Sequence, residues 1–213
     1  MIKITADGDT NIGLHGFCTD KKLISGMPSK ESKQAAKEMG VERVSAILFN
    51  TDLAGLFAAG NATGIVVARI AEDFSRFPGN LNILKIETKH TAIGNLILAN
   101  DYGAIISPLL RKSAKEIGNF LNVRTAVSGI AGLGIIGSAA LATNKGCLVH
   151  PRVKDGEKRI IEEVLGVRAM IGTVNFGSPY VRAGIIANSR GFAASPASSG
   201  PELGNITEAL GFL

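Results

Sequence analysis

The sequence predicts an α/β fold in which five similar units close into one ring. A hairpin-like phrase recurs along the chain, for example in IGNLILANDYGAIISPLL from Ile93 and IIGSAALATNKGCLVHP from Ile135. Glycine and proline keep fixed positions around its turn. The last unit lacks a strand, and an unassigned strand stands at the start of the chain. Repetition at a period of about 20 to 50 residues is the signature of a repeat architecture.

The residues that close the five turns define the repeat: Lys22, Gly64, Gly103, Gly146 and Gly191. They are 42, 39, 43 and 45 residues apart. Nine residues before them stand Gly13, Gly55, Gly94 and Gly137, and in the fifth unit Arg182. We therefore predict a single domain over residues 1–213 with five repeats, approximately 6–50, 51–90, 91–130, 131–172 and 173–213, the last completed by strand 2–5.

Each unit is expected to begin with a hairpin. Asn or Thr opens the turn with a side-chain hydrogen bond to the backbone, and Gly closes it where a positive φ is often required. The runs from Leu96 to Ala99 and from Ala104 to Ser107 are apolar on both faces, with Ser107 at the end as their one polar residue. Continuous apolar runs of this length are typical of strands buried on both faces. They are predicted to be the two hairpin strands.

A helix and a third strand are expected after the hairpin. Helical segments start at Ser29, Arg111 and Asp155, and Ser113 with Glu116 fits a capping box. In the second unit, AEDFSRFPGNLN contains Pro78 and Gly79 and predicts a degenerate turn. The third strand is clearest in VERVSAILF and VRTAV.

The two ends of the chain complement each other. The fifth unit ends with the helix PELGNITEALGF and has no third strand, whereas IKIT from Ile2 has no unit. If the first strand completes the last unit, the ring has no open edge, as in propellers. An open solenoid would instead need polar capping units, and neither end is polar. A closed ring is therefore predicted.

Composition limits the class of protein. The chain has 213 residues, a net charge of +5 and a pI near 9.3, with Lys and Arg scattered along it. This balance permits RNA as a secondary partner without demanding nucleic acid. The two cysteines favour a reducing compartment, and the charged opening MIKITADGDTN predicts no export signal. A cytoplasmic protein without a membrane span or a DNA partner is expected.

The motifs that resemble catalytic or cofactor sites lack the required context. GLGIIG from Gly132 matches a dinucleotide fingerprint, but the repeat register predicts a strand from Ser138 to Ala142 where a helix would be needed. Cys147 and His150 are three residues apart on one strand, which directs them to opposite faces. No enzyme activity, cofactor or metal site is predicted, and function is expected to lie in a surface.

One end of the ring is the candidate surface. Its strand-entry loops carry Asn95, Tyr180, Leu56, Ser138 and Arg182. Tyr and Arg are over-represented among binding hot spots, and Asn adds adaptable hydrogen bonds. A purely structural interpretation stays open, in which the neighbouring glycines meet strand-entry requirements and Tyr180 covers the core.

Four phrases make the chain similar to a known family: NIGLHGFCTDKKLI, IGNLILANDYGAIISPLL, NKGCLVHPRV and GTVNFGSPYVRAGIIANSRGFAA. Over essentially its full length the chain resembles the archaeal and eukaryotic translation initiation factor 6 family, and its length resembles the shorter archaeal members. The resemblance implies the pentein fold, a five-fold pseudo-symmetric α/β propeller.

The resemblance also implies a function and a partner. Members of the family keep large ribosomal subunits from joining small ones, with a role in large-subunit biogenesis. This chain is expected to be a monomer. The expected contact is a ribosomal protein near the sarcin-ricin loop, with rRNA secondary. Asn95 and Tyr180 carry over from the family's motifs, whereas Leu56, Ser138 and Arg182 follow by repeat symmetry.

The same fold implies one alternative function. Pentein proteins include guanidine-modifying hydrolases and transferases, which use a cysteine of the last unit with a histidine base. Nucleophile and base must come within hydrogen-bonding reach. No residue after Pro151 is Cys or His in this chain. This amidino-group alternative therefore finds no matching nucleophile.

Overall fold

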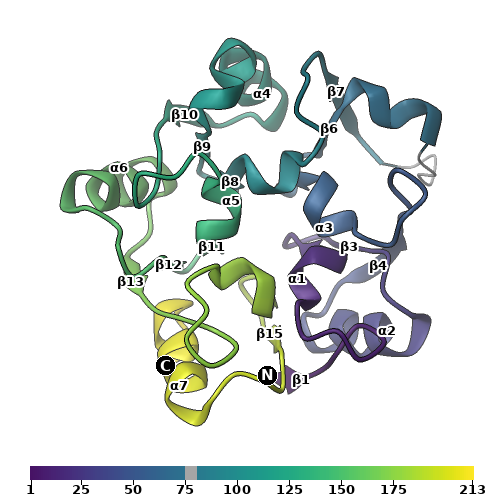
Figure 1. Ribbon diagram of the computed structural model, residues 1–213, viewed down its shortest axis with the longest axis vertical. Coiled ribbons are helices and arrows are strands. Elements are labelled where there is room, and N and C mark those ends of the chain that lie inside the picture. Colours follow the sequence, from purple (N-terminus) through teal and green to yellow (C-terminus); the bar gives the residue numbers. More distant parts are fainter. Residues whose placement is uncertain (75–80) are drawn as a thin grey trace.

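Five three-stranded sheets follow one another around an axis in the computed structural model, which describes residues 1–74 and 81–213 (Figure 1). In each sheet the middle strand pairs antiparallel with its hairpin partner and parallel with the third strand. The predicted five-fold α/β propeller is confirmed.

The strands of each sheet are short. From the first unit to the fifth they are β2 Gly16–Cys18, β3 Lys22–Ser25 and β4 Glu42–Ser45; β5 Ala59–Gly60, β6 Ile65–Ala68 and β7 Ile83–Ile86; β8 Ile97–Ala99, β9 Gly103–Ile106 and β10 Arg124–Val127; β11 Ala140–Ala142, β12 Cys147–Val149 and β13 Ala169–Ile171; β14 Ile185–Ala187, β15 Phe192–Ala194 and β1 Ile2–Lys3.

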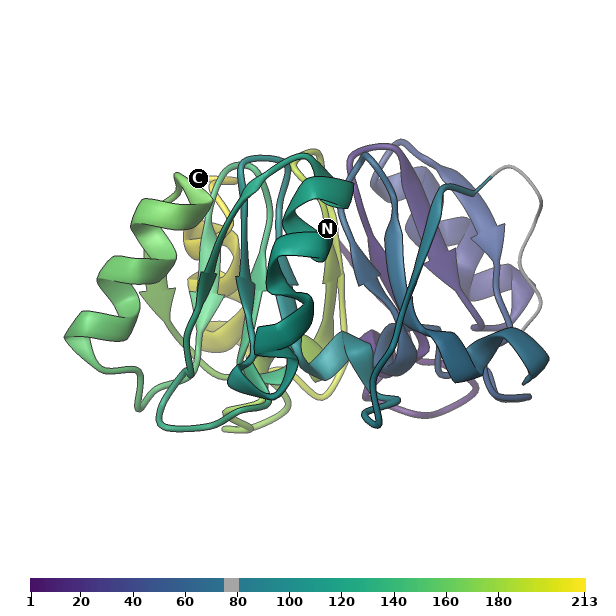
Figure 2. The same cartoon turned by 90° about the horizontal axis from the view of Figure 1, so that it is seen from above.

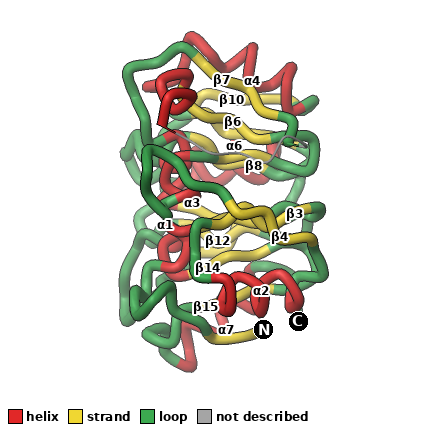
Figure 3. Tube along the Cα trace, turned by 90° about the vertical axis from the view of Figure 1, so that its right-hand side faces the viewer, coloured by secondary structure: helices red, strands yellow, loops and turns green. Residues whose placement is uncertain are grey.

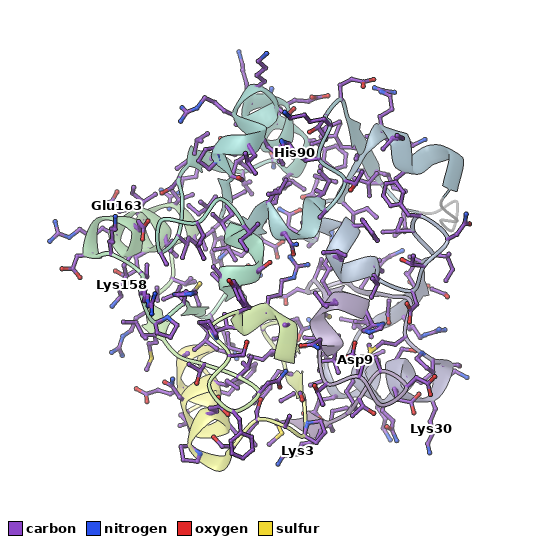
Figure 4. All side chains as sticks on the ribbon, in the orientation of Figure 1. Lys3, Asp9, Lys30, His90, Lys158 and Glu163 are labelled. Atoms are coloured by element: carbon purple, nitrogen blue, oxygen red, sulfur yellow. The ribbon has the colours of Figure 1, made fainter. Side chains whose placement is uncertain are left out.

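Two sets of helices accompany the strands. Just before each hairpin lies a single turn: α1 Ile12–His15, α3 Ala54–Phe57, η2 Ile93–Asn95, α5 Ile136–Ala139 or η4 Val181–Gly184. After each hairpin come the outer helices α2 Ser29–Glu38, η1 Arg69–Phe74, η3 Pro108–Ser113 with α4 Ala114–Leu121, α6 Asp155–Leu165 and α7 Gly200–Ala209. The outer helices form the rim, where Lys30, Lys158 and Glu163 lie (Figure 4). The predicted turn at Pro78 and Gly79 lies outside the described residues.

The first strand closes the ring as expected. β1 lies parallel to β15, with Ile2 opposite Ala193 and Lys3 opposite Ala194. The next residue, Ile4, continues the pairing by donating its backbone N–H to the Ala194 carbonyl at 3.1 Å. The N-terminus lies in the same unit as α7 (Figure 1). The edge of β15 is thereby paired with a strand from the other end of the chain.

The core is divided among the sheets. Among the described residues, five hydrophobic clusters fill the five spaces between consecutive sheets. On β9, Ala104 and Ile106 pack toward the second unit while Ile105 packs toward the fourth. Successive residues of a strand point to opposite faces, so a sheet covered on both sides needs apolar residues at every position. This explains the continuous apolar runs of the repeat.

Hydrogen bonds from the hairpin turns tie neighbouring units together. Asn100 Oδ1 accepts from the Tyr102 and Gly103 backbone, which forms the expected turn. Its amide nitrogen donates to the carbonyls of Thr143 and Leu165 in the next unit, at 3.1 and 2.8 Å. Asn61 and Asn188 make the corresponding bonds. A turn residue therefore also fixes the angle between sheets.

Two local predictions are wrong. Ser138 and Ala139 belong to the one-turn helix α5, so the strand predicted from Ser138 begins at Ala140. This helix starts at Ile136 and has four residues, too few for a dinucleotide-binding helix. The capping box at Ser113 is also absent, because Ser107 instead accepts from Leu109 N at 3.2 Å and begins the helical segment six residues earlier.

Candidate binding face at one end of the ring

The one-turn helices gather at one end of the ring, opposite the hairpin turns. Figures 2 and 3 show the strands running between these two ends, with the short helices along one of them. Each one-turn helix contacts the next, and the fifth contacts the first. A Cβ at Gly13, Gly55, Gly94 or Gly137 would collide with a backbone carbonyl of the one-turn helix beside it. The recurring glycine is therefore required by close backbone contact around the axis.

Arg182 occupies the position that the other units give to glycine, and its side chain crosses the axis. Its guanidinium donates to the carbonyls of Gly94, Gly55 and Ala58, the second at 3.1 Å and the third at 3.4 Å. The Cζ atom lies 5.8 Å from the Phe17 ring centroid. Burial lowers the pKa of Arg182 to about 10, so the group keeps its charge at neutral pH. The sequence predicts a surface role for Arg182, and in the structure its side chain also holds three units together.

Four of the five candidate residues line one cavity of about 250 Å³ on this face, namely Asn95, Ser138, Tyr180 and Arg182. Ser138 Oγ donates to Asn95 Oδ1 at 2.8 Å, which joins the third and fourth units. The remaining walls are Gly13, Leu14, Gly55, Ile135 and Ala183. Leu56 lies in α3 beside Gly55, half-buried and outside the cavity lining. The four candidate residues come from three consecutive units, and the complete lining draws on all five.

Tyr180 stands at the edge of the cavity and is 41% exposed. Its ring meets that of His150 edge-on, with 6.2 Å between centroids. Burial, followed by the positive charge of Arg152, lowers the pKa of His150, so the imidazole is neutral at pH 7. A neutral ring beside an exposed tyrosine extends the uncharged part of the face.

Sequence reasoning missed a second exposed aromatic residue on the same end, Phe176, which is 83% exposed. Its φ of 59° is left-handed, and Asn175 and Gly177 on either side are left-handed too. The buried Glu202 carboxylate accepts from the backbone N–H groups of Phe176 and Gly177, at 3.2 and 2.8 Å. In the sequence, the triplet Asn175-Phe176-Gly177 could have indicated a turn with an exposed aromatic residue at its tip.

The hydrogen bonds that hold the Phe176 loop, here called the clamp, depend on the ionised carboxylate of Glu202. Burial opposes the charge of Glu202, but hydrogen bonds from the Ser199 and Gly177 backbone and from the Thr173 and Ser199 hydroxyls outweigh it. They lower the pKa of Glu202 to about 2. Glu157 holds the equivalent turn of the fourth unit through Ala131 N and Gly132 N. In the fourth and fifth units, therefore, a Glu on the outer helix fixes a loop with left-handed residues on the candidate binding face.

The thiols do not have the environment of nucleophiles. Burial raises the pKa of Cys147, and the Glu162 carboxylate raises it further. Burial also raises the pKa of Cys18, with a smaller contribution from Asp20. Reactive cysteines instead have a lowered pKa in a positive environment.

His15 is hydrogen-bonded through both ring nitrogens, to Asp52 at 2.9 Å and Asp9 at 3.0 Å.

Within residues 1–74 and 81–213, no group of three or more His, Cys, Asp and Glu side chains is placed to hold a metal ion. None of the helices in these residues has both the length and the apolar character that a membrane crossing needs.

The five three-stranded sheets define a ring-shaped, five-fold pseudo-symmetric α/β protein of the pentein class. The eIF-6 family model matches residues 1–209, and the chain belongs to the eIF-6 family. It is 36% identical to translation initiation factor 6 of Pyrococcus abyssi over 95% of this chain and 94% of the relative. Identity is also 36% to the factor of that name from Methanosarcina mazei, over the whole of both chains. These relatives are named translation initiation factors, and this chain belongs to the same family.

Proposed function

We propose that this protein binds the large ribosomal subunit and prevents the small subunit from joining it. The relatives are named translation initiation factors, which supports work at the ribosome. The observation that carries the proposal is the convergence of Asn95, Ser138, Tyr180 and Arg182 on one cavity at one end of the ring. Residues of three units meet there, and the exposed Phe176 lies on the same end of the ring.

The mechanism is steric. The ring docks through the face of one-turn helices, and its bulk occupies space that the small subunit needs. A specific interface buries roughly 800 Å² on each partner, an area that one end of a 22.2 kDa ring can supply. The docking partner on the large subunit is a ribosomal protein near the sarcin-ricin loop. No covalent chemistry is required.

RNA contacts are secondary. The chain carries a net charge of +5, and charged side chains such as Lys30 and Lys158 lie on the outer rim (Figure 4). Contacts between such groups and phosphates release counterions and weaken as salt rises. The apolar wall of the cavity, formed by Leu14, Ile135 and Ala183, suits protein-first recognition, with rRNA at the margins of the face. We further propose that the ring acts as a monomer in the cytoplasm, and that its docking also accompanies large-subunit assembly.

Co-sedimentation with isolated large and small subunits across a salt series tests the proposal. We expect the wild-type protein to sediment with large subunits and not with small ones. Tyr180→Ala should weaken binding at least about tenfold, which is the scale of an aromatic hot spot. Tyr102→Ala is the matched control, because Tyr102 is 52% exposed on a hairpin turn at the opposite end. A greater loss of binding in Tyr102→Ala would mean that the ring docks through the end that carries the hairpin turns.

A charge variant provides an independent test of the face. Asn95→Arg adds a long cation to the cavity wall, whereas Asn119→Arg adds one to α4 on the outer rim. We expect only the first to abolish large-subunit binding. Preferential binding of wild-type protein to the small subunit, or equal binding to both, would refute the proposed function.

A further inference from the structure

Arg182 brings an unpaired positive charge to the centre of the proposed docking face. Its three hydrogen bonds go to the neutral carbonyls of Gly94, Gly55 and Ala58. No carboxylate of the described chain forms an ion pair with it. Guanidinium has five N–H donors, so these bonds leave two of them for other partners. A desolvated charge without a counter-charge costs free energy that an incoming anion would recover.

The cavity above Arg182 has the chemistry of an anion site with an apolar entrance. Among the described residues that line it, none is acidic. Ser138 already occupies the Asn95 Oδ1 atom, so the Asn95 amide offers its two N–H donors, and the Tyr180 hydroxyl offers a third. Leu14, Ile135 and Ala183 supply apolar wall. An occupant that fits has an aliphatic stem and ends in hydrogen-bond acceptors with negative charge.

The dimensions limit the size of the occupant. The cavity of about 250 Å³ is smaller than the roughly 300 to 1,000 Å³ of sites for drug-sized ligands. It accommodates one amino-acid side chain. Arg182 also lines a narrower space of about 40 Å³ among the strands. Arg182 therefore borders both the cavity and this inner space.

We propose that this cavity receives the carboxylate of an acidic side chain, presented by the ribosomal protein on which the ring docks. The carboxylate would accept from one free N–H donor of Arg182, and its methylene stem would pack against Leu14 and Ile135. A single charge-assisted hydrogen bond of this kind is about twice as strong as a neutral one. A nucleic-acid phosphate fits less well, because sugars on both sides of it would have to enter a mainly apolar pocket. The inference rests on the proposed function and adds the chemistry of the partner's anchor.

A small-molecule probe tests the cavity without the ribosome. We would titrate the isolated protein with 4-methylpentanoate and with the neutral isostere 4-methylpentanamide, following the Arg182 side-chain N–H signal by NMR. We expect millimolar binding of the carboxylate and at least about tenfold weaker binding of the amide, since charge-assisted hydrogen bonds are about twice as strong as neutral ones. Equal affinity, or no perturbation of Arg182, would overturn the proposal.

Two variants extend the test to the docked state. Arg182→Met removes the charge but also three interunit hydrogen bonds, so its fold must be checked by thermal denaturation. Leu14→Trp fills the cavity and leaves Arg182 intact, and Tyr102→Trp places the same ring at the opposite end. We expect Leu14→Trp to abolish 4-methylpentanoate binding and to weaken large-subunit binding at least about tenfold, with Tyr102→Trp unchanged.

The outcomes separate this inference from the proposed function. If wild-type protein does not sediment with large subunits, the proposed function fails. If it does sediment and Leu14→Trp binds as tightly as wild type, the cavity is not an anchor site and the inference alone fails. Competition between 4-methylpentanoate and a short RNA for the Arg182 signal would assign the site to phosphate and would also overturn the carboxylate proposal.

Discussion

Ser138 Oγ donates a hydrogen bond to Asn95 Oδ1 across 2.8 Å, and this bond joins the third and fourth units on the candidate binding face. It also sets the orientation of the Asn95 amide, whose nitrogen is left to bind a partner. Two residues 43 positions apart in the chain thus become one recognition element.

Ser138→Ala is expected to weaken large-subunit binding severalfold with little effect on the fold. Net loss of one half-buried hydrogen bond costs about 1 kcal/mol of unfolding free energy, and the freed Asn95 amide can rotate. Urea unfolding and co-sedimentation measure the two effects. Ser138→Thr keeps the hydroxyl and should bind as wild type does. If Ser138→Ala binds as tightly as wild type, the bond between Ser138 and Asn95 does not contribute to recognition.

The central glycines should be intolerant of any side chain. Gly55→Ala would place a Cβ against the carbonyls of Gly13 and Gly16, so we expect a loss of at least about 3 kcal/mol in unfolding free energy or failure to fold. Gly204→Ala is the control: no atom lies within 4 Å of its Cβ position, and the site is an exposed turn of α7. Helix propensity predicts a gain of up to about 1 kcal/mol there.

Deleting residues 1–4 should open the ring. The deletion removes β1 and the buried Ile4, and it leaves β15 with an unpaired edge. We expect a large fall in melting temperature and aggregation through the exposed strand, because open edges pair with other chains. Removing Leu213, which is 88% exposed, is the control and should change neither property. Unchanged melting after the longer deletion would show that β1 does not support closure.

Acid should weaken the clamp on the Phe176 loop. The pKa of Glu202 is about 2 in the folded protein, below its ordinary value of 4.5. The stabilisation is therefore complete above pH about 4.5 and is lost as pH falls toward 2, by up to about 3 kcal/mol. Urea unfolding at pH 7, 4 and 2.5 should show a smaller acid loss in Glu202→Gln than in wild type.

Glu163→Gln provides the comparison for this measurement, since Glu163 lies exposed on the outer rim (Figure 4). It should follow the wild-type pH profile. A Glu202→Gln profile parallel to that of wild type would mean that the hydrogen-bonded carboxylate contributes nothing to the acid response.

The thiols should be slow to react. Burial raises the pKa of Cys18 and Cys147, so the thiolate fraction at neutral pH is very small. We expect alkylation by iodoacetamide in the native protein to be far slower than in the urea-unfolded protein, and Cys18→Ala to bind large subunits as wild type does. Rapid alkylation of one native cysteine would revive the amidino-group alternative.

Some features could be predicted because they are written in local patterns. The interval between turns, the glycines at fixed offsets and the unassigned strand at Ile2 were sufficient for the five-fold ring and its closure. Asn100 as a turn opener follows from side-chain chemistry, and the two-sided burial of β9 follows from its continuous apolar sequence.

Other features depend on residues that are distant in the chain. A sequence pattern does not distinguish the one-turn helices from strand starts, because four residues such as Ile136–Ala139 carry too little periodicity. The pattern favours Ser113 as the capping residue, whereas in the structure Ser107 opens a 3₁₀ segment before α4. The loop of Phe176 is held by Glu202, 26 residues later, which no local pattern shows.

The sequence by itself determined the number of units, their order and their circular closure, since each unit repeats the same local preferences and each sheet needs a neighbour on both faces. Only the tertiary structure decided what lies at the axis. Where four units have glycine, Arg182 extends across to Gly94 and Gly55, and it lines a cavity that no single unit contains. Pairing over such separations is set by how the five units pack, because local patterns do not specify which carbonyls meet at the centre.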